Sequence, residues 1–156
     1  MKKKHHINEI EVEASKINLK QPLGRFLIIL FRQFEEELMA ELSKKGHRTI
    51  SAADLNVLRH IDPKGISANR IAELAGVSKQ AISKQINKLD KDGLIKREVD
   101  TEDQRAQQIA FTKKGEKLIY DSIAIIEKIE NRFANILGGS AQLEKVKSSL
   151  NRLIDK

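Results

Sequence analysis

Five polar side chains with helical spacing lie between residues 79 and 87, and none of them is a carboxylate. They are Lys79, Gln80, Ser83, Lys84 and Asn87. At about 100° per residue, a helix brings all five onto one arc, and it places Ile82, Ile86 and Leu89 on the opposite side. Glutamine and asparagine amides can pair with adenine, and lysine binds guanine or phosphate oxygens. The arc therefore has the chemistry of a surface that contacts DNA.

The competing interpretation is an ordinary solvated helix face. Such faces usually mix glutamate with lysine, because the two pair three or four residues apart. Here residues 79–97 carry six basic side chains against only Asp90 and Asp92, whereas residues 116–156 carry seven basic and six acidic ones. The net charge of +7 is therefore concentrated around this helix, which favours a polyanionic partner.

The residues before and within this segment predict two short helices joined by a tight turn. Ser67 and Ser78 each precede a helical pattern and can act as N-caps. The first predicted helix, over residues 67–75, turns its apolar residues inward. Gly76 allows the turn that leads to the second helix, over residues 78–91. Two capped helices joined in this way form a helix-turn-helix.

A β-hairpin is predicted directly after the second helix. The segments LIKREV (94–99) and QQIAFT (107–112) have strand character and flank a polar tip. A hairpin in this position extends the helix-turn-helix into a winged helix. The predicted fold is therefore mainly α, with a β-hairpin wing.

Helices are also predicted on both sides of this core. Ser51 with Asp54 resembles a capping box, and Thr112 is placed to cap a long helix that the glycine pair 138–139 ends. The additional predicted helices cover about residues 22–44, 51–61 and 113–137, and a last helix begins at Ser140. Apolar stripes follow three of them: Phe26, Leu27, Leu30, Phe34, Leu38 and Leu42; Ile119, Ile123, Ile126, Ile129, Phe133 and Leu137; and Leu143, Val146, Leu150 and Leu153.

The segment ISANRIAELAGVSKQAISKQINKLDKDGLIKREVDTEDQRAQQIAFTKKG, residues 66–115, resembles the MarR (multiple antibiotic resistance regulator) family. The specific features are L-x-x-x-G-L-I at 89–95, D-x-R at 103–105 and F-T-x-x-G at 111–115, and the helix order extends the resemblance to about residues 20–156. The resemblance implies one domain over residues 21–156. It has a winged-helix core at about 50–115 and dimerisation helices at about 22–44 and 113–155. Residues 1–20 are expected to form a partly flexible extension.

The resemblance also implies how the chain contacts DNA. Helix 79–91 would enter the major groove and the wing, residues 96–108, would follow the minor groove, where Asp103 orients Arg105. Helix N-termini attract phosphate, so the two N-cap serines are also expected to lie against the DNA backbone. The predicted DNA-contacting residues are Ser67, Ser78, Lys79, Gln80, Ser83, Lys84, Asn87, Lys88, Arg97, Asp103 and Arg105. Gln104 departs from the family, whose wing often has arginine there.

The function expected from these features is a homodimeric, sequence-specific transcription regulator that binds double-stranded DNA at a pseudo-palindromic operator, most simply a ligand-responsive repressor. An activator or counter-silencer of the same fold is the first alternative, and a winged helix used for protein contact is the second. Many relatives bind small aromatic or lipophilic effectors between the dimer helices and the winged domain. This sequence offers apolar residues there but no distinctive polar anchor.

Other classes of protein are disfavoured. No Ser/His/Asp arrangement, phosphate-binding glycine loop or HExxH motif is present, so an enzyme is not expected. There is no cysteine, and His47 and His60 have no ligand spacing around them, so neither a metal nor another cofactor is expected. No apolar run approaches the roughly 18 residues of a membrane span, and a cytoplasmic protein without membrane contact is predicted.

Overall fold

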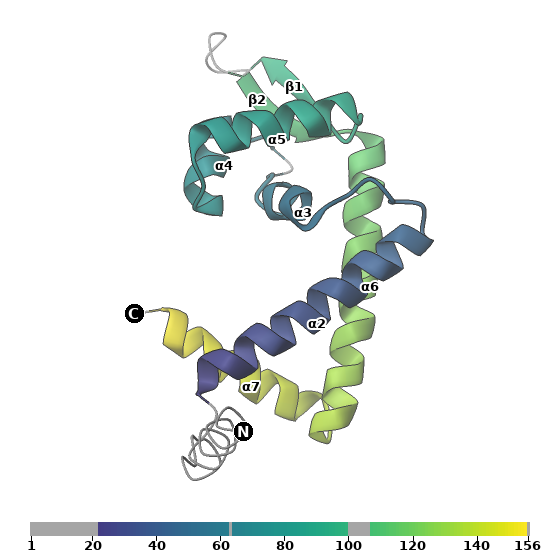
Figure 1. The fold of residues 1–156 in the computed structure, drawn as a ribbon, viewed down its shortest axis with the longest axis vertical. Coiled ribbons are helices and arrows are strands. Elements are labelled where there is room, and N and C mark those ends of the chain that lie inside the picture. Colours follow the sequence, from purple (N-terminus) through teal and green to yellow (C-terminus); the bar gives the residue numbers. More distant parts are fainter. Residues whose placement is uncertain (1–21, 63, 100–106, 156) are drawn as a thin grey trace, which may run out of the picture. The chain divides into compact units, whose positions relative to one another are not determined.

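The computed structural model describes residues 22–62, 64–99 and 107–155. This part of the chain is mainly α-helical with one antiparallel hairpin, as predicted (Figure 1). The elements are α2 (Leu23–Lys44), α3 (Ala52–Leu58), α4 (Ala68–Ala75), α5 (Lys79–Lys91), β1 (Ile95–Val99), β2 (Gln107–Phe111), α6 (Lys113–Leu137) and α7 (Ser140–Ile154). None of the described helices combines the length and the apolar character needed to cross a bilayer.

The structure consists of two units, Met1–Phe34 and Glu35–Lys156, and α2 continues from one into the other. In the first unit, the start of α2 exposes a dense set of large apolar side chains: Leu23, Phe26, Leu27, Ile28, Ile29, Leu30 and Phe31. In the second unit, the end of α2 buries Leu38 and Leu42. The predicted inner stripe of this helix is therefore buried within the chain only at its C-terminal end.

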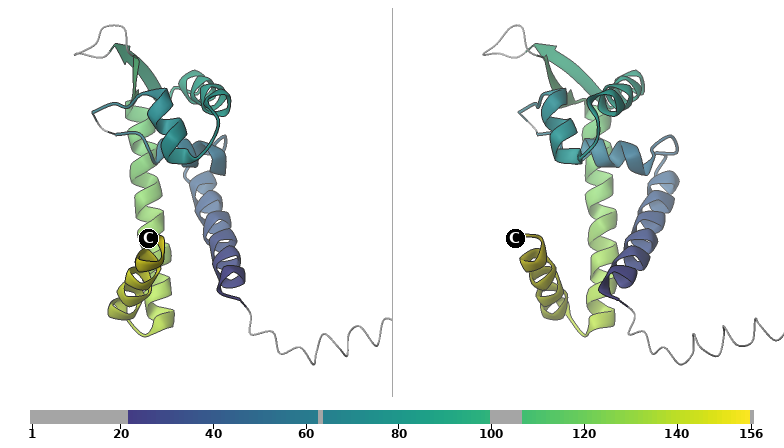
Figure 2. Two further views of the ribbon diagram at one scale, coloured as in Figure 1. Left: turned by 90° about the vertical axis from the view of Figure 1, so that its left-hand side faces the viewer. Right: turned by 60° about the vertical axis from the view of Figure 1, so that its left-hand side comes forward.

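The core of the winged helix is formed by α3, α4, α5 and the hairpin. Helix α5 packs against α3, α4 and β1, and these elements gather at one end of α6 (Figure 2). The apolar face predicted for residues 79–91 is confirmed, since Ile82, Ile86 and Leu89 are buried. The other buried apolar side chains of this core are Ile50, Val57, Leu58, Ile61, Ile71, Ala72, Leu94, Ile95 and Ile109.

The starts of α3, α4, α5 and α6 are defined by side-chain caps, and these four caps are as predicted. Ser51 and Asp54 form a reciprocal capping box, and the hydroxyls of Ser67, Ser78 and Thr112 accept hydrogen bonds from backbone N–H groups three residues further on. Each cap satisfies a backbone donor that the helix leaves without a partner, and each typically contributes about 0.5–2 kcal/mol.

The wing contains one strand pairing that the sequence did not reveal. The predicted strands pair antiparallel, with Arg97 opposite Ile109. In addition, Ile66 exchanges two backbone hydrogen bonds with Ile109, of 3.2 and 2.8 Å. The start of the helix-turn-helix is thereby fixed to the outer edge of β2. The wing tip, residues 100–106, lies outside the described residues.

Within the chain, helix α6 buries a face that is offset from the apolar stripe noted in its sequence. Its buried residues are Gly115, Leu118, Ser122, Ile125, Ile129 and Ala134, so Ile129 is the only member of the predicted stripe that is buried. Ile123 and Leu137 are exposed. Helix α7 turns back against α6 but has no buried residue. The sequence of α6 is apolar on two faces, and periodicity cannot tell which of them packs inside the chain.

The junction between the wing and α6 is unusually close. The Thr112 hydroxyl donates to the carbonyl of Gly93 at 2.6 Å and caps α6 by accepting from Gly115 N–H at 3.1 Å. The Thr112 N–H donates to the carbonyl of Leu94 at 3.1 Å. A Cβ atom on Gly115 would lie 1.9 Å from that same carbonyl oxygen. The F-T-x-x-G pattern therefore joins α6 to the chain directly after α5.

A cluster of charges ties the loop after α2 to α6. The Asp121 carboxylate, which is largely buried, lies 2.7 Å from Lys117 Nζ, 2.8 Å from His47 Nε2 and 3.0 Å from Lys45 Nζ. Hydrogen bonds from Lys117, His47 and Lys45 hold the pKa of Asp121 well below its usual range. A carboxylate with a depressed pKa stabilises the fold most where it is ionised.

We expect Asp121→Asn to lower the free energy of unfolding by about 1 kcal/mol at pH 7, because its partners include exposed lysines. The folded-state pKa is below the unfolded value of 3.8, so the contribution is complete above about pH 4 and is lost as the pH falls further. Urea unfolding of the wild type and of Asp121→Asn should therefore show a difference in free energy of unfolding that becomes smaller below pH 4. Glu127→Gln, which removes an exposed carboxylate from the same helix, is the control. A difference in free energy of unfolding between the wild type and Asp121→Asn that does not depend on pH would contradict the expectation.

Candidate nucleic-acid interface

Helix α5 presents the predicted polar arc to the exterior. Gly76 takes a left-handed conformation at φ 66°, which ends α4, and Ser78 then starts α5. The side chains of Lys79, Gln80, Ser83 and Lys84 are all exposed. Within the described residues they form no hydrogen bond or ion pair. Their donors are therefore available to a partner, and two of the four groups are positively charged.

The end of the arc is held by the wing. Arg97 on β1 donates a hydrogen bond to the Asn87 side-chain oxygen and lies 3.4 Å from the Asp90 carboxylate. These contacts bring together two predicted site residues, Asn87 and Arg97. They also hold the guanidinium group at the seam between α5 and the hairpin.

A hollow of ≈ 180 Å³ opens beside this seam. Its polar lining consists of Ser83, Asn87, Arg97 and Gln107. Its floor is apolar, with Ile86 and Ile109. The sequence did not indicate Gln107 as part of this surface, because strand pairing brings it there and its own residue type carries no signal.

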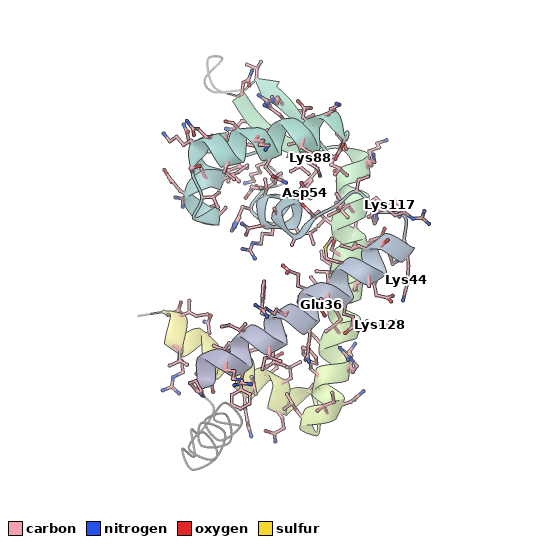
Figure 3. The ribbon with its side chains drawn as sticks, viewed as in Figure 1. Glu36, Lys44, Asp54, Lys88, Lys117 and Lys128 are labelled. Carbon is pink, nitrogen blue, oxygen red and sulfur yellow. The ribbon has the colours of Figure 1, made fainter. Side chains whose placement is uncertain are left out.

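Lys88, a predicted DNA-contacting residue, has partners inside the protein. Its Nζ atom lies 2.6 Å from an oxygen of Asp54, whose side chain is fully buried, and 3.2 Å from the carbonyl of Thr49 (Figure 3). Gln85, one turn earlier on α5, donates its amide to the other Asp54 oxygen. Sequence reasoning missed Gln85 and Asp54 here, because each partner is more than 30 residues away along the chain.

The charges in this cluster stabilise one another. Burial raises the pKa of Asp54, but hydrogen bonds from Lys88 and Ser51 outweigh it, and the net pKa is lowered. The hydrogen bond to Asp54 raises the pKa of Lys88. Both groups are therefore ionised at neutral pH, and the ammonium group of Lys88 is not free in the way that of Lys84 is.

The remaining predicted site residues lie at the two caps and in the wing. Ser67 and Ser78 occupy their predicted cap positions at the N-termini of α4 and α5. Asp103 and Arg105 lie outside the described residues, so their contact with the minor groove stays a prediction. No group of three or more His, Cys, Asp or Glu side chains in the described ranges is arranged to hold a metal ion.

The family model that matches this chain is that of the MarR family, over residues 49–106. The matched residues include the helix-turn-helix and the predicted wing as far as residue 106. This segment, which is less than half of the chain, is similar to the MarR family. The transcriptional regulator HosA of Escherichia coli O111:H- is 30% identical over 87 residues, which are 55% of this chain and 64% of HosA. The match therefore spans less than two thirds of the length of this curated relative.

Solved structures have the same fold. CouR from Rhodococcus jostii RHA1, bound to p-coumaroyl-CoA, superposes with a TM-score of 0.70 at 19% identity, covering 88% of this chain and 94% of CouR. The F27L mutant of MepR from S. aureus, bound to an oligodeoxyribonucleotide, superposes with a TM-score of 0.58 at 20% identity, covering 86% of this chain and 97% of MepR. Most of the chain therefore has the same fold as CouR and MepR.

Proposed function

We propose that this protein is a sequence-specific, double-stranded DNA-binding transcription regulator that acts as a homodimer. The observation that carries the proposal is the exposed arc of α5, where Lys79, Gln80, Ser83 and Lys84 have no partner among the described residues. A cationic helix face with amide and hydroxyl donors, placed after a helix-turn-helix, fits the major groove of B-DNA. The oligonucleotide bound to the MepR mutant supports a DNA partner for this fold.

The contacts divide into two kinds. Gln80, Ser83 and Asn87 would reach base edges, whereas Lys79, Lys84 and Arg97 would bind phosphate. Ser67 and Ser78 would place helix N-termini near the DNA backbone. The wing would add the minor-groove contact of Arg105, oriented by Asp103. The protein is then expected to work in the cytoplasm of its cell, where the DNA lies.

The dimer is proposed from the exposed apolar side chains at the start of α2. Phe31 is 59% exposed and Leu23 is 54% exposed, and five further large apolar residues between them are also exposed. Contiguous apolar surface of this kind marks an interface, and a palindromic operator requires two copies.

For the regulation, we propose that the protein is a repressor controlled by a small aromatic or lipophilic effector. CouR is bound to p-coumaroyl-CoA, a coenzyme A thioester whose acyl group is aromatic. An activator or counter-silencer would use the same DNA-binding surface, so reporter assays in cells with and without the protein are needed to give the sign.

The test of the proposal is selection of binding sites from random duplex DNA with the full chain, followed by affinity titration at several salt concentrations. We expect an inverted repeat with half-sites about one helical turn apart. Equal affinity for selected and scrambled duplexes would contradict the proposal, and it would favour a winged helix used for protein contact.

Lys84→Ala and Gln80→Ala should affect DNA binding in different ways: the first should change affinity for all DNA, and the second should change sequence preference. Loss of the Lys84 phosphate contact should weaken operator and scrambled DNA alike, and it should lower the salt slope by about one per protomer. Loss of the Gln80 amide should cost about 1–3 kcal/mol at one base position and leave the slope unchanged. Titration of operator variants by fluorescence anisotropy separates the two effects, and the reverse pattern would overturn this placement of α5.

A further inference from the structure

We infer that Asp54 is a positioning residue for α5, the proposed DNA-binding helix. Lys88 binds Asp54 and helps to fix the orientation of α5, and it does not contact DNA. This inference rests on the proposed function, because it concerns how α5 is held in place for DNA. It assigns Lys88 a different role from the one its residue type suggests.

The contacts of Asp54 use both of its oxygens. One accepts the amide of Gln85, and the other accepts Lys88 Nζ at 2.6 Å, the Ser51 hydroxyl at 2.7 Å and the Ser51 N–H at 2.8 Å. Asp54 is 0% exposed, so water does not reach the carboxylate itself. The carboxylate therefore joins the N-terminus of α3 to α5 through groups that would be costly to separate.

The geometry on α5 explains why this contact would set the orientation of the helix. Gln85 and Lys88 are three residues apart, so they lie on one side of the helix, close to a full turn from each other. Two anchor points separated along the axis oppose both rotation about the axis and sliding along it. The base-facing side chains Gln80 and Ser83 are on the same rigid helix. A rotation of α5 would therefore displace them together.

The ammonium group of Lys88 makes a further bond to the protein, although the Lys88 side chain is 43% exposed. Its ammonium group also donates to the carbonyl of Thr49 at 3.2 Å, which lies just before the capping box. Three protein oxygens therefore surround the charge: those of Asp54 and Thr49, and that of Asp92 at 3.4 Å. Lys84, one turn earlier, has no such partner among the described residues. The two lysines of one helix thus have different roles.

The experiment compares Lys88→Met with Lys84→Met on the selected operator and on a scrambled duplex of equal length, over a range of salt concentrations. Methionine keeps the apolar stem of lysine and leaves the capping box intact. We expect Lys88→Met to weaken operator binding about 5- to 100-fold, the size of a misplaced bidentate base contact. Its affinity for scrambled DNA and its salt slope should stay at the wild-type values, whereas Lys84→Met should lower both.

Asp54→Asn supplies the second measurement. It removes the charge that holds Lys88, so the operator affinity should fall while the freed ammonium group increases binding to scrambled DNA. The double variant Asp54→Asn with Lys88→Met should return scrambled-DNA binding to the wild-type level. A change confined to fold stability would not move these two affinities in opposite directions. If Asp54→Asn does not fold by circular dichroism, Gln85→Leu replaces it and should weaken operator binding only.

The outcomes separate the inference from the proposed function. A wild-type protein without any preference for a selected sequence contradicts the function itself. If the wild type is specific but Lys88→Met lowers both affinities and the salt slope, Lys88 is a phosphate contact and the inference is wrong. If Lys88→Met binds both duplexes like the wild type, the contact between Lys88 and Asp54 does not position α5, and the inference is also wrong. Lys128→Met, an exposed lysine on α6, controls for the change in net charge.

Discussion

Gly115→Ala should lower the free energy of unfolding by about 3 kcal/mol or more, although it adds only a methyl group. The new Cβ atom would lie 1.9 Å from the Leu94 carbonyl oxygen and 3.0 Å from a ring carbon of Phe111. The oxygen belongs to the backbone, so it cannot rotate away as a side chain could. Relief requires moving α6 away from Leu94, which also stretches the hydrogen bond from Thr112 N–H to that carbonyl.

The control is Gly24→Ala, which adds the same methyl group to another helix. Apart from its chain neighbours and the backbone of its own helix, no heavy atom of the described residues lies within 4 Å of a Cβ atom at Gly24, and alanine favours helices over glycine by about 0.5–1 kcal/mol. Urea unfolding at one fixed protein concentration should therefore show opposite shifts for the two variants. A Gly115→Ala protein as stable as the wild type would mean that α6 does not approach Leu94 so closely in solution.

Leu30→Glu should convert the proposed dimer to monomer and weaken operator binding by about 100-fold or more. Leu30 is half exposed in the single chain and is surrounded by other exposed apolar residues of α2. A glutamate in an apolar interface would have to lose its water without gaining a partner. A monomer holds one half-site only, so it loses the effective concentration that a second linked site provides.

Gln33→Glu is the matched control, because it adds the same charge to an exposed polar position of the same helix. Sedimentation equilibrium measures the dimer and anisotropy measures operator affinity. Circular dichroism verifies that the helices remain. If Leu30→Glu stays dimeric with full operator affinity, the start of α2 is not the interface.

Local chemistry made much of this fold predictable. The caps at Ser51, Ser67, Ser78 and Thr112 are confirmed because an N-cap depends only on residues within one turn. The two faces of α5 are confirmed because its apolar and polar arcs are cleanly separated. The boundary between the N-terminal extension and the remainder of the chain, near residue 20, stays a prediction.

The parts that could not be predicted depend on long-range contacts. The pairing of Ile66 with Ile109 and the contacts of Asp54 with Gln85 and Lys88 join residues 30 to 45 positions apart. Lysine on a cationic helix looks the same whether it binds phosphate or a buried carboxylate. On α6, two apolar faces compete, and only tertiary packing selects Leu118 and Ile125 over Ile119 and Ile126.

The tight junction at Thr112 makes the winged helix, from α3 to β2, follow any change in the direction of α6. Thr112 is the single residue between β2 and α6, and it is bonded to Gly93 and Leu94 directly after α5. Helix α6 has 25 residues, which corresponds to a length of about 37 Å. A tilt of about 10° at its far end therefore displaces the winged helix by about 6 Å, roughly two base steps of 3.4 Å along the DNA. Any event that changes the angle of α6 within a dimer would thus alter which operator spacing the two copies can span.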